Sequence, residues 1–250
     1  MRSSGWQVAV RAEGDVIIST AMGHQTGPSG PLSTDAGSAD VLPTGRQERR
    51  KARTRRALVD AAVRLTAAGR VEQATIQEIT EEADLGFGTF YNHFASKEEL
   101  FRVAETEVLE HWGRSLDLAC AGVEDPVEAF AARFRLAGRV GRTHPELARF
   151  LTELGLDALT SPDGLAPRAR RDLAAAFAAG RLRHVAPDVA VSTVAGALIG
   201  LLQLQLGAPD GVPDRVVDEV TAGVLRLLGA DPQEADEVVS RPLPEARFGA

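Results

Sequence analysis

The chain has 250 residues, of which 44% are hydrophobic and 5% aromatic, and its formal net charge is −7. This length and composition suit two modest domains with a packed core. A single cysteine, Cys120, excludes an internal disulfide, no stretch approaches eighteen uninterrupted apolar residues, and the start lacks a signal-peptide pattern, so a cytoplasmic protein is predicted.

Residues 1–45 are rich in Gly, Ser, Thr and Pro and show no sustained hydrophobic period, which predicts a disordered N-terminal extension. The apolar triplets at 8–10 and 16–18 leave a marginal hairpin as the alternative, with nothing adjacent to bury it. Met22 is an alternative start, which would leave residues 1–21 outside the protein.

The first helix is predicted over about 47–68, with Leu58, Ala61, Ala62 and Leu65 on its inward stripe and Gly69 at its end. Its N-terminal part is strongly basic: seven Arg or Lys residues and one acid between Arg46 and Arg56 give a local charge of +6 in an otherwise acidic chain. Such a run is usually a solvated face, but beside a helix-turn-helix it is an electrostatic footprint for phosphate.

A helix-turn-helix is predicted immediately downstream. Thr75 and Glu78 have capping-box spacing, and Asp84-Leu85-Gly86 interrupts the apolar stripe of the helix that they open. A second helix is predicted over about 86–94. Ser96 and Glu99 repeat the capping-box spacing, so a third helix begins at Lys97.

The second of these helices presents a ridge suited to the DNA major groove. At 100° per residue, Phe90 and Phe94 define the buried face, and Gly88 and Asn92 lie opposite, flanked by Thr89 and Tyr91. Asn can pair bidentately with adenine, while Thr and Tyr hydroxyls bond phosphate or base edges. The predicted DNA contacts are Arg50, Arg53, Thr75, Gly88, Thr89, Tyr91, Asn92, His93 and Lys97.

The segments LVDAAVRLTAAG and TIQEITEEADLGFGTFYNHFASKEELF, within residues 53–101, resemble the N-terminal DNA-binding domain of the TetR family of bacterial transcriptional regulators. The resemblance implies a dimer, a recognition helix over 86–93, and a separate C-terminal domain that senses a ligand or mediates assembly. Gly86 departs from the Ser, and Phe87 from the polar or basic residue, that many members carry there.

The remaining chain is predicted to be helical, which makes the fold all-α. The predicted domains are 46–101 for DNA binding, 102–229 for effector binding and dimerisation, and 230–250 as a flexible tail. Helices are expected over about 97–119, from Asp125, from Pro145, over 167–179, over 187–206 and over 213–228, with a loop at 155–167.

The last two predicted helices are apolar nearly all round, so each must be buried on more than one side. A dimer seam is the favoured explanation and an intramolecular core the alternative. The interface set is Val194, Leu198, Leu201, Leu202, Val217, Val220 and Val224, with Gly196 and Gly200 permitting close approach. A dimer would place two recognition helices about 34 Å apart, as a palindromic operator requires.

An apolar cavity between helices is the expected place for an unidentified small-molecule effector. The candidate lining is Phe130, Phe134, Phe150, Leu151, Leu154 and Phe177, with Arg133, Arg135 and His144 as polar handles. Each could equally be plain core or surface.

An enzyme and an architectural DNA binder without an effector are the competing classes. No metal is expected, because the five histidines lack metal-ligand spacing: His24, His93, His111, His144 and His184. No cofactor is expected either, because no glycine-rich phosphate loop follows a strand. The favoured function is a repressor that binds double-stranded DNA as a homodimer.

Overall fold

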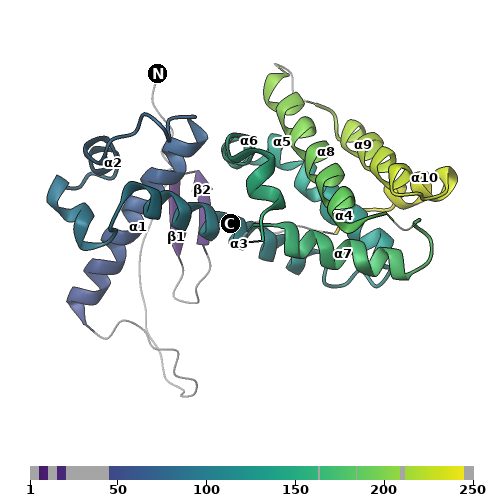
Figure 1. The fold of residues 1–250 in the computed structure, drawn as a ribbon, viewed down its shortest axis with the longest axis horizontal. Coiled ribbons are helices and arrows are strands. Elements are labelled where there is room, and N and C mark those ends of the chain that lie inside the picture. Colours follow the sequence, from purple (N-terminus) through teal and green to yellow (C-terminus); the bar gives the residue numbers. More distant parts are fainter. Residues whose placement is uncertain are drawn as a thin grey trace, which may run out of the picture.

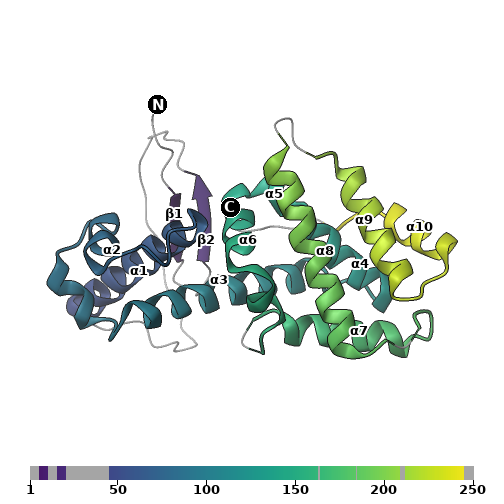
Figure 2. The ribbon, with the colours of Figure 1, turned by 45° about the horizontal axis from the view of Figure 1, so that its top comes forward.

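A computed structural model describes residues 6–10, 16–20, 45–162, 164–183, 185–208 and 212–244. Two helical lobes are joined by one long helix, α3 (Lys97–Ala119), which runs from the first lobe into the second (Figures 1 and 2). The predicted all-α architecture of an N-terminal helix-turn-helix lobe and a C-terminal helical lobe is confirmed.

The N-terminal lobe consists of α1 (Arg46–Ala67), α2 (Ile76–Glu82), the 3-10 helix η1 (Phe87–Asn92) and the start of α3. Its core is one apolar cluster: Leu58, Val59, Ala62, Leu65, Ala74, Ile79, Phe90, Phe94, Leu100 and Ala104. The inward stripe predicted for the first helix is buried as expected.

The C-terminal lobe contains α4 (Pro126–Gly138), α5 (Val140–Thr143), α6 (Pro145–Thr160), α7 (Ala166–Ala178), α8 (Pro187–Gly207), α9 (Asp214–Leu227) and α10 (Pro232–Ser240). The end of α3 packs into the same core through Leu109, Trp112 and Leu116. Helix α6 also contacts α1, so the two lobes touch directly as well as through α3.

Within the N-terminal extension, Trp6–Val10 (β1) and Val16–Thr20 (β2) form an antiparallel two-stranded hairpin, with Val8 opposite Ile18. Here the structure favours the hairpin that was the alternative to disorder. The rest of the predicted disordered segment, including Met22, lies outside the described residues except for Gly45.

Two predictions for the C-terminal lobe were wrong. The first part of the predicted loop at 155–167 is helical, because α6 continues to Thr160 across a kink at Gly155, whose φ is 72°. The predicted flexible tail contains α10, whose Asp231 accepts hydrogen bonds from the backbone of Gln233 and Glu234. Ala235 and Val238 bury this helix against α9 and α4.

Helix α8 is a core helix with one exposed edge. Among the described helices it alone is long and apolar enough to cross a membrane, by length and composition only, a test that core helices also pass. It packs against α4, α5, α6, α7 and α9.

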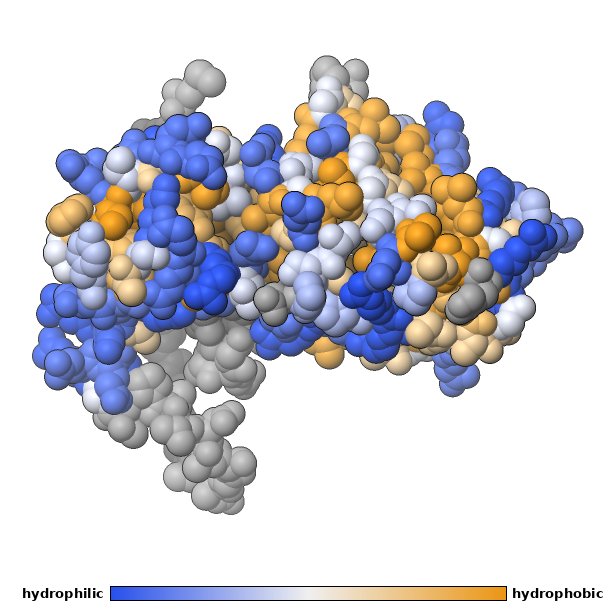
Figure 3. Space-filling view, in the orientation of Figure 1, coloured by the Kyte–Doolittle hydropathy of each residue, from blue (hydrophilic) through white to orange (hydrophobic). Residues whose placement is uncertain are grey.

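The residues predicted for a dimer seam do not form an exposed face. Six of the seven side chains are buried inside the protomer: Val194, Leu198, Leu201, Leu202, Val217 and Val224. The seventh, Val220, is half-buried. The alternative of an intramolecular core is correct for those six side chains. The outer edge consists instead of Val189, Gly196, Gly200 and Leu204 of α8, with Leu227 of α9, and apolar surface extends over α8 and α9 in Figure 3.

Candidate nucleic-acid interface and ligand cavity

The helix-turn-helix is fixed at its start by the predicted capping box. The backbone N–H of Glu78 donates to the Thr75 hydroxyl oxygen at 3.2 Å, and the Glu78 carboxylate accepts from the Thr75 N–H at 2.9 Å. The hydrogen bond from the Thr75 backbone lowers the pKa of Glu78 below its usual value. After α2, Asp84 turns the chain with a positive φ of 55°, a conformation that Asp tolerates better than most residues.

The recognition element is a 3-10 helix of six residues, shorter and tighter than the predicted α-helix over 86–94. Backbone bonds from Thr89 to Gly86 and from His93 to Phe90 have the i to i+3 pattern. Gly88 in its first turn weakens the preference for an α-helix. At three residues per turn, Thr89 and Asn92 share one face and Gly88 and Tyr91 share another.

The predicted reading surface is accessible in this geometry. Gly88, Tyr91 and Asn92 are exposed, Thr89 is half-exposed, and a Cβ placed on Gly88 would meet nothing within 4 Å. Phe87 is also exposed, by 54%, so an apolar ring stands beside the polar side chains.

A chain of aromatic contacts anchors this surface to the core. The ring of Phe87 lies edge-on to that of Tyr91 at 6.1 Å between centroids, and Tyr91 lies edge-on to the buried Phe90 at 5.4 Å. Phe90 contacts Phe94, over which the Arg55 guanidinium lies at 5.3 Å. Such pairs hold side chains in defined positions.

The basic segment of α1 separates into two groups. Arg55 and Arg56 bond the carboxylate of Glu107 in α3, at 2.9 and 3.5 Å, and Arg56 also bonds Asp60. The other five bases are exposed and make no ion pair with the described residues: Arg46, Arg49, Arg50, Lys51 and Arg53. Arg50 and Arg53 are therefore accessible to phosphate.

Two predicted DNA contacts have intramolecular surroundings. The ammonium of Lys97 donates to the carbonyls of Val71 and Glu72 at 3.0 and 3.1 Å, so it stabilises the loop before α2. Burial, aided by Lys51 and Arg55, lowers the pKa of His93, and its buried Nδ1 has no hydrogen-bond partner among the described residues. The capping at the start of α3 is largely as predicted, since Ser96 accepts from Glu99, but the Glu99 carboxylate reaches back to Ala95.

The C-terminal lobe holds a cavity of about 100 Å³ between α3, α4, α7 and α8. Most of its wall is apolar, and its lining comprises Trp112, Gly113, Leu116, Asp117, Phe130, Arg133, Phe134, Ala137, Leu159, Leu165, Arg168, Ala169, Asp172, Val191, Val194, Ala195 and Leu198.

Only part of the candidate pocket set lines this cavity: Phe130, Phe134 and the handle Arg133 do. Phe150 and Leu151 are buried elsewhere in α6, and Leu154 and Phe177 are packed against the surrounding core. Arg135 is directed to an ion pair with Asp218 at 2.7 Å, and His144 precedes α6.

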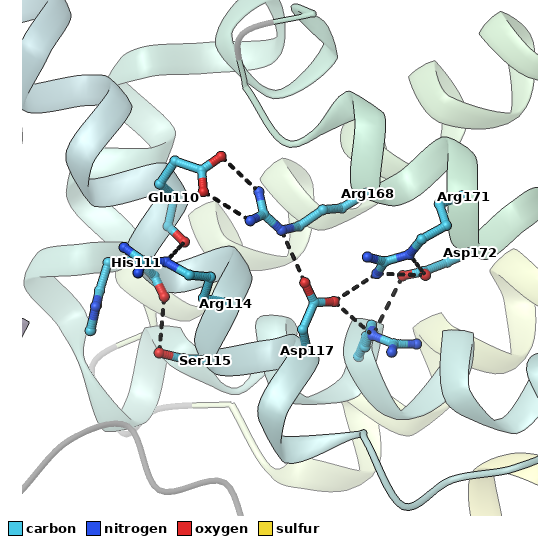
Figure 4. A network of polar contacts seen from close by, with 9 residues as sticks. Glu110, His111, Arg114, Ser115, Asp117, Arg168, Arg171 and Asp172 are labelled. Atoms are coloured by element: carbon cyan, nitrogen blue, oxygen red, sulfur yellow. Dashed lines mark hydrogen bonds and ion pairs between the residues drawn. The ribbon is translucent and has the colours of Figure 1, made fainter. Parts of the chain in front are cut away.

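Sequence reasoning missed the polar end of the cavity, which α3 and α7 build together (Figure 4). Arg168 holds the Glu110 carboxylate with two bonds, at 3.1 and 3.0 Å, and donates its Nε–H to Asp117 at 3.1 Å. Arg171 adds a bond to Asp117 at 2.6 Å and one to Asp172 at 2.9 Å. This network ties the cavity to α3.

The charges of this network are mutually compensated. Burial alone would raise the pKa of Asp117, but hydrogen bonds from Arg171 and Arg168 outweigh it and lower the pKa below its usual value. The bonds from Arg168 likewise lower the pKa of Glu110. Both carboxylates are therefore anionic at neutral pH. No group of three or more His, Cys, Asp or Glu within the described ranges is placed to hold a metal ion.

A helix-turn-helix that shares a helix with a cavity-containing lobe has the architecture of a ligand-responsive DNA-binding regulator. The chain belongs to the TetR family. A family model described as bacterial regulatory proteins, tetR family, matches residues 58–104, and one described as a tetracyclin repressor-like C-terminal domain matches residues 125–241.

Individual relatives agree with this assignment. The chain is 34% identical to the HTH-type transcriptional regulator TcmR of Streptomyces glaucescens over 110 residues, and 35% identical over 79 residues to the HTH-type nicotine-responsive transcriptional repressor HdnoR of Paenarthrobacter nicotinovorans. These matches take up 43% and 32% of this chain and span 48% and 40% of those relatives, about half their length or less. The structure of RolR with its ligand resorcinol is similar at a TM-score of 0.63 and 34% identity, covering 80% of this chain and 99% of RolR.

Proposed function

We propose that this regulator is a sequence-specific repressor that binds a palindromic operator as a homodimer and is released by a small, largely apolar ligand. The observation that carries the proposal is α3, since one helix begins beside the recognition element and ends in the wall of the cavity.

On the DNA side, η1 enters the major groove. Asn92 and Thr89 contact base edges, Gly88 permits close approach, and Tyr91, His93 and Thr75 bond phosphate or neighbouring edges. Arg50 and Arg53 supply phosphate contacts that fix position without reading sequence. Lys97 joins them through the third N–H of its ammonium group, because the carbonyls of Val71 and Glu72 accept only two of its three donors.

The homodimer forms through the outer edge of α8 and α9. Val189, Leu204 and Leu227 are large apolar side chains in water, and a Cβ on Gly196 or Gly200 would meet nothing within 4 Å. Exposed apolar area of this kind is characteristic of an interface. Two copies joined here by a two-fold axis would present two recognition elements to successive major grooves.

The effector occupies the cavity. Its wall is mainly apolar and is formed by α3, α4, α7 and α8 with Leu159 of α6, and helical proteins usually place small-molecule sites between helices. Two relatives support the class of ligand: RolR was solved with resorcinol, and HdnoR is nicotine-responsive. Both ligands are compact ring compounds.

Release requires differential affinity. A ligand that binds better to the conformation with the wrong spacing of recognition elements weakens DNA binding, and DNA weakens ligand binding by the same factor. The ion pairs from Arg168 to Glu110 and Asp117 connect the cavity to α3, and Arg55 and Arg56 connect α3 to α1 through Glu107.

The test is a selection of genomic DNA fragments by the purified full chain at near-physiological salt, followed by a salt titration on the enriched fragment. We expect one inverted repeat to be enriched and bound by a dimer. Leu204→Glu should shift the free protein toward monomer and abolish tight operator binding, whereas Gln203→Glu, on the same exposed turn, should change it less. Uniform binding to all sequences would support an architectural protein and contradict the proposal.

A further inference from the structure

Two buried N–H groups at the cavity donate no hydrogen bond to any described residue. Trp112 is only 2% exposed, and its indole Nε1–H has no hydrogen-bond partner among the described residues. The Nε–H of Arg133 is also buried without one, its nearest carboxylates, Asp117 and Asp172, lying at 3.6 and 3.5 Å. Both residues line the cavity.

A buried Trp N–H usually finds a partner, because leaving it without one costs its full desolvation penalty. No described residue accepts a hydrogen bond from the Trp112 indole, and the carboxylates of Asp117 and Asp172 are bonded to Arg168 and Arg171. An acceptor atom brought by the occupant of the cavity would satisfy the indole.

The charges lining the cavity balance. Among the residues that the structure describes, the charged ones lining the cavity are two acids, Asp117 and Asp172, and two bases, Arg133 and Arg168. Glu110 and Arg171, the two described residues that bond these lining side chains from outside the cavity, have opposite charges as well. An ionised ligand would bring an uncompensated charge into a largely apolar site, which is costly.

The volume of the cavity suits an occupant of about one ring. Its volume is about 100 Å³, and an engineered apolar cavity of about 150 Å³ in another protein holds benzene. Asp117 and Asp172 line one end of the cavity, so the occupant gains from a hydroxyl, which can donate to a carboxylate while it accepts from an N–H group.

We infer that the effector is an uncharged, single-ring compound bearing at least one hydroxyl group, whose oxygen accepts the hydrogen bond of Trp112. Trp112 is thus the residue that distinguishes a hydroxylated ring from a hydrocarbon of the same shape. The inference rests on the proposed function, in which the cavity is the effector site.

The first experiment varies the ligand and leaves the protein unchanged. Calorimetric titration of the full chain with phenol and with toluene compares hydroxyl with methyl on the same ring, and phenol is neutral at pH 7. We expect phenol to bind at least about tenfold more tightly. A second pair, 3-hydroxybenzyl alcohol and 3-hydroxybenzoate, compares neutral with anionic, and the anion should bind at least about tenfold more weakly. Equal affinities in the first pair, or a preferred anion in the second, would overturn the inference, as would no binding of any of these four compounds.

The second experiment assigns the selectivity to Trp112. Trp112→Phe removes the N–H and keeps an aromatic ring, so the preference for phenol over toluene should fall by about threefold to tenfold. The control is Phe134→Leu, which changes the same wall without removing a polar atom and should weaken both ligands to a similar extent. An unchanged preference in folded Trp112→Phe would refute the role of the indole.

Release of the selected operator fragment by the same compounds separates this inference from the proposed function. Release by toluene and phenol at equal concentrations would support a ligand-released repressor and overturn the ligand class. Binding of phenol without any change in operator affinity would support the ligand class and contradict the repressor mechanism.

Discussion

Asp218→Asn should destabilise the C-terminal lobe more than removal of any exposed ion pair. The Arg135 side chain is 7% exposed and bonds the 26%-exposed carboxylate of Asp218 at 2.7 Å. Removing one partner of a buried pair costs about 3–5 kcal/mol, and the partial exposure of Asp218 reduces this to about 2–4 kcal/mol. For a chain of this size, that corresponds to a fall in melting temperature of about 5–15 °C, measured by circular dichroism.

Two comparisons make this prediction specific. Arg135→Met removes the buried charge itself and leaves Asp218 paired with Arg139 at 3.2 Å, so it should cost less than Asp218→Asn. Asp236→Asn breaks an exposed pair with Arg226 and should change stability by about 0.5 kcal/mol or less. If Asp218→Asn were as mild as Asp236→Asn, the argument from the buried guanidinium would be refuted.

Three further predictions concern DNA binding, pH and the C-terminal helix. Arg50→Ala should weaken binding to all DNA sequences and lower the slope of log affinity against log salt by about 1. Asn92→Ala should instead relax the preference at one or two base pairs by about 1–3 kcal/mol, which quantitative binding to operator variants would measure. Equal weakening of every sequence by Asn92→Ala would contradict base reading. Burial lowers the pKa of His144 below 6.5, so as pH falls the unfolded state binds a proton at this histidine before the folded state does. The melting temperature should therefore fall as pH drops below about 6.5, and it should fall less steeply in His144→Gln. Parallel curves of melting temperature against pH for the two proteins would assign the loss of stability to other groups. Truncation after Ala230 should lower the free energy of unfolding by at least about 3 kcal/mol, because burial of Val238 alone contributes about 1.5–3 kcal/mol. Thermal unfolding measures this loss, and an unchanged melting temperature would mean that α10 does not pack against α4 and α9.

The elements predicted well were those with local signals. The Thr75 capping box and the Asp125-Pro126 start of α4 appear as expected, because an N-cap depends only on residues three or four apart. The same signal, Asp231 followed by Pro232, stands at the start of α10, so this helix could have been found despite the polar composition around it.

The features that the sequence did not predict depend on tertiary structure or on small differences in the number of residues per helical turn. Six residues around Phe90 do not distinguish 100° from 120° per residue, so the 3-10 geometry of η1 was not readable. Asp117 and Arg168 stand 51 positions apart, and only the packing of α7 on α3 and α4 makes them neighbours. Because α8 is apolar nearly all round, its composition could not show which edge faces water.

The length of α3 makes it a mechanical lever. From Lys97 to Trp112 the axis extends about 22 Å. A tilt of about 5° at the cavity would therefore move the start of α3 by about 2 Å, more than a base-edge hydrogen bond tolerates. In a symmetric pair the two displacements would add or cancel according to their direction relative to the two-fold axis. An occupant of about one ring could in this way change the distance between two recognition elements without itself approaching DNA.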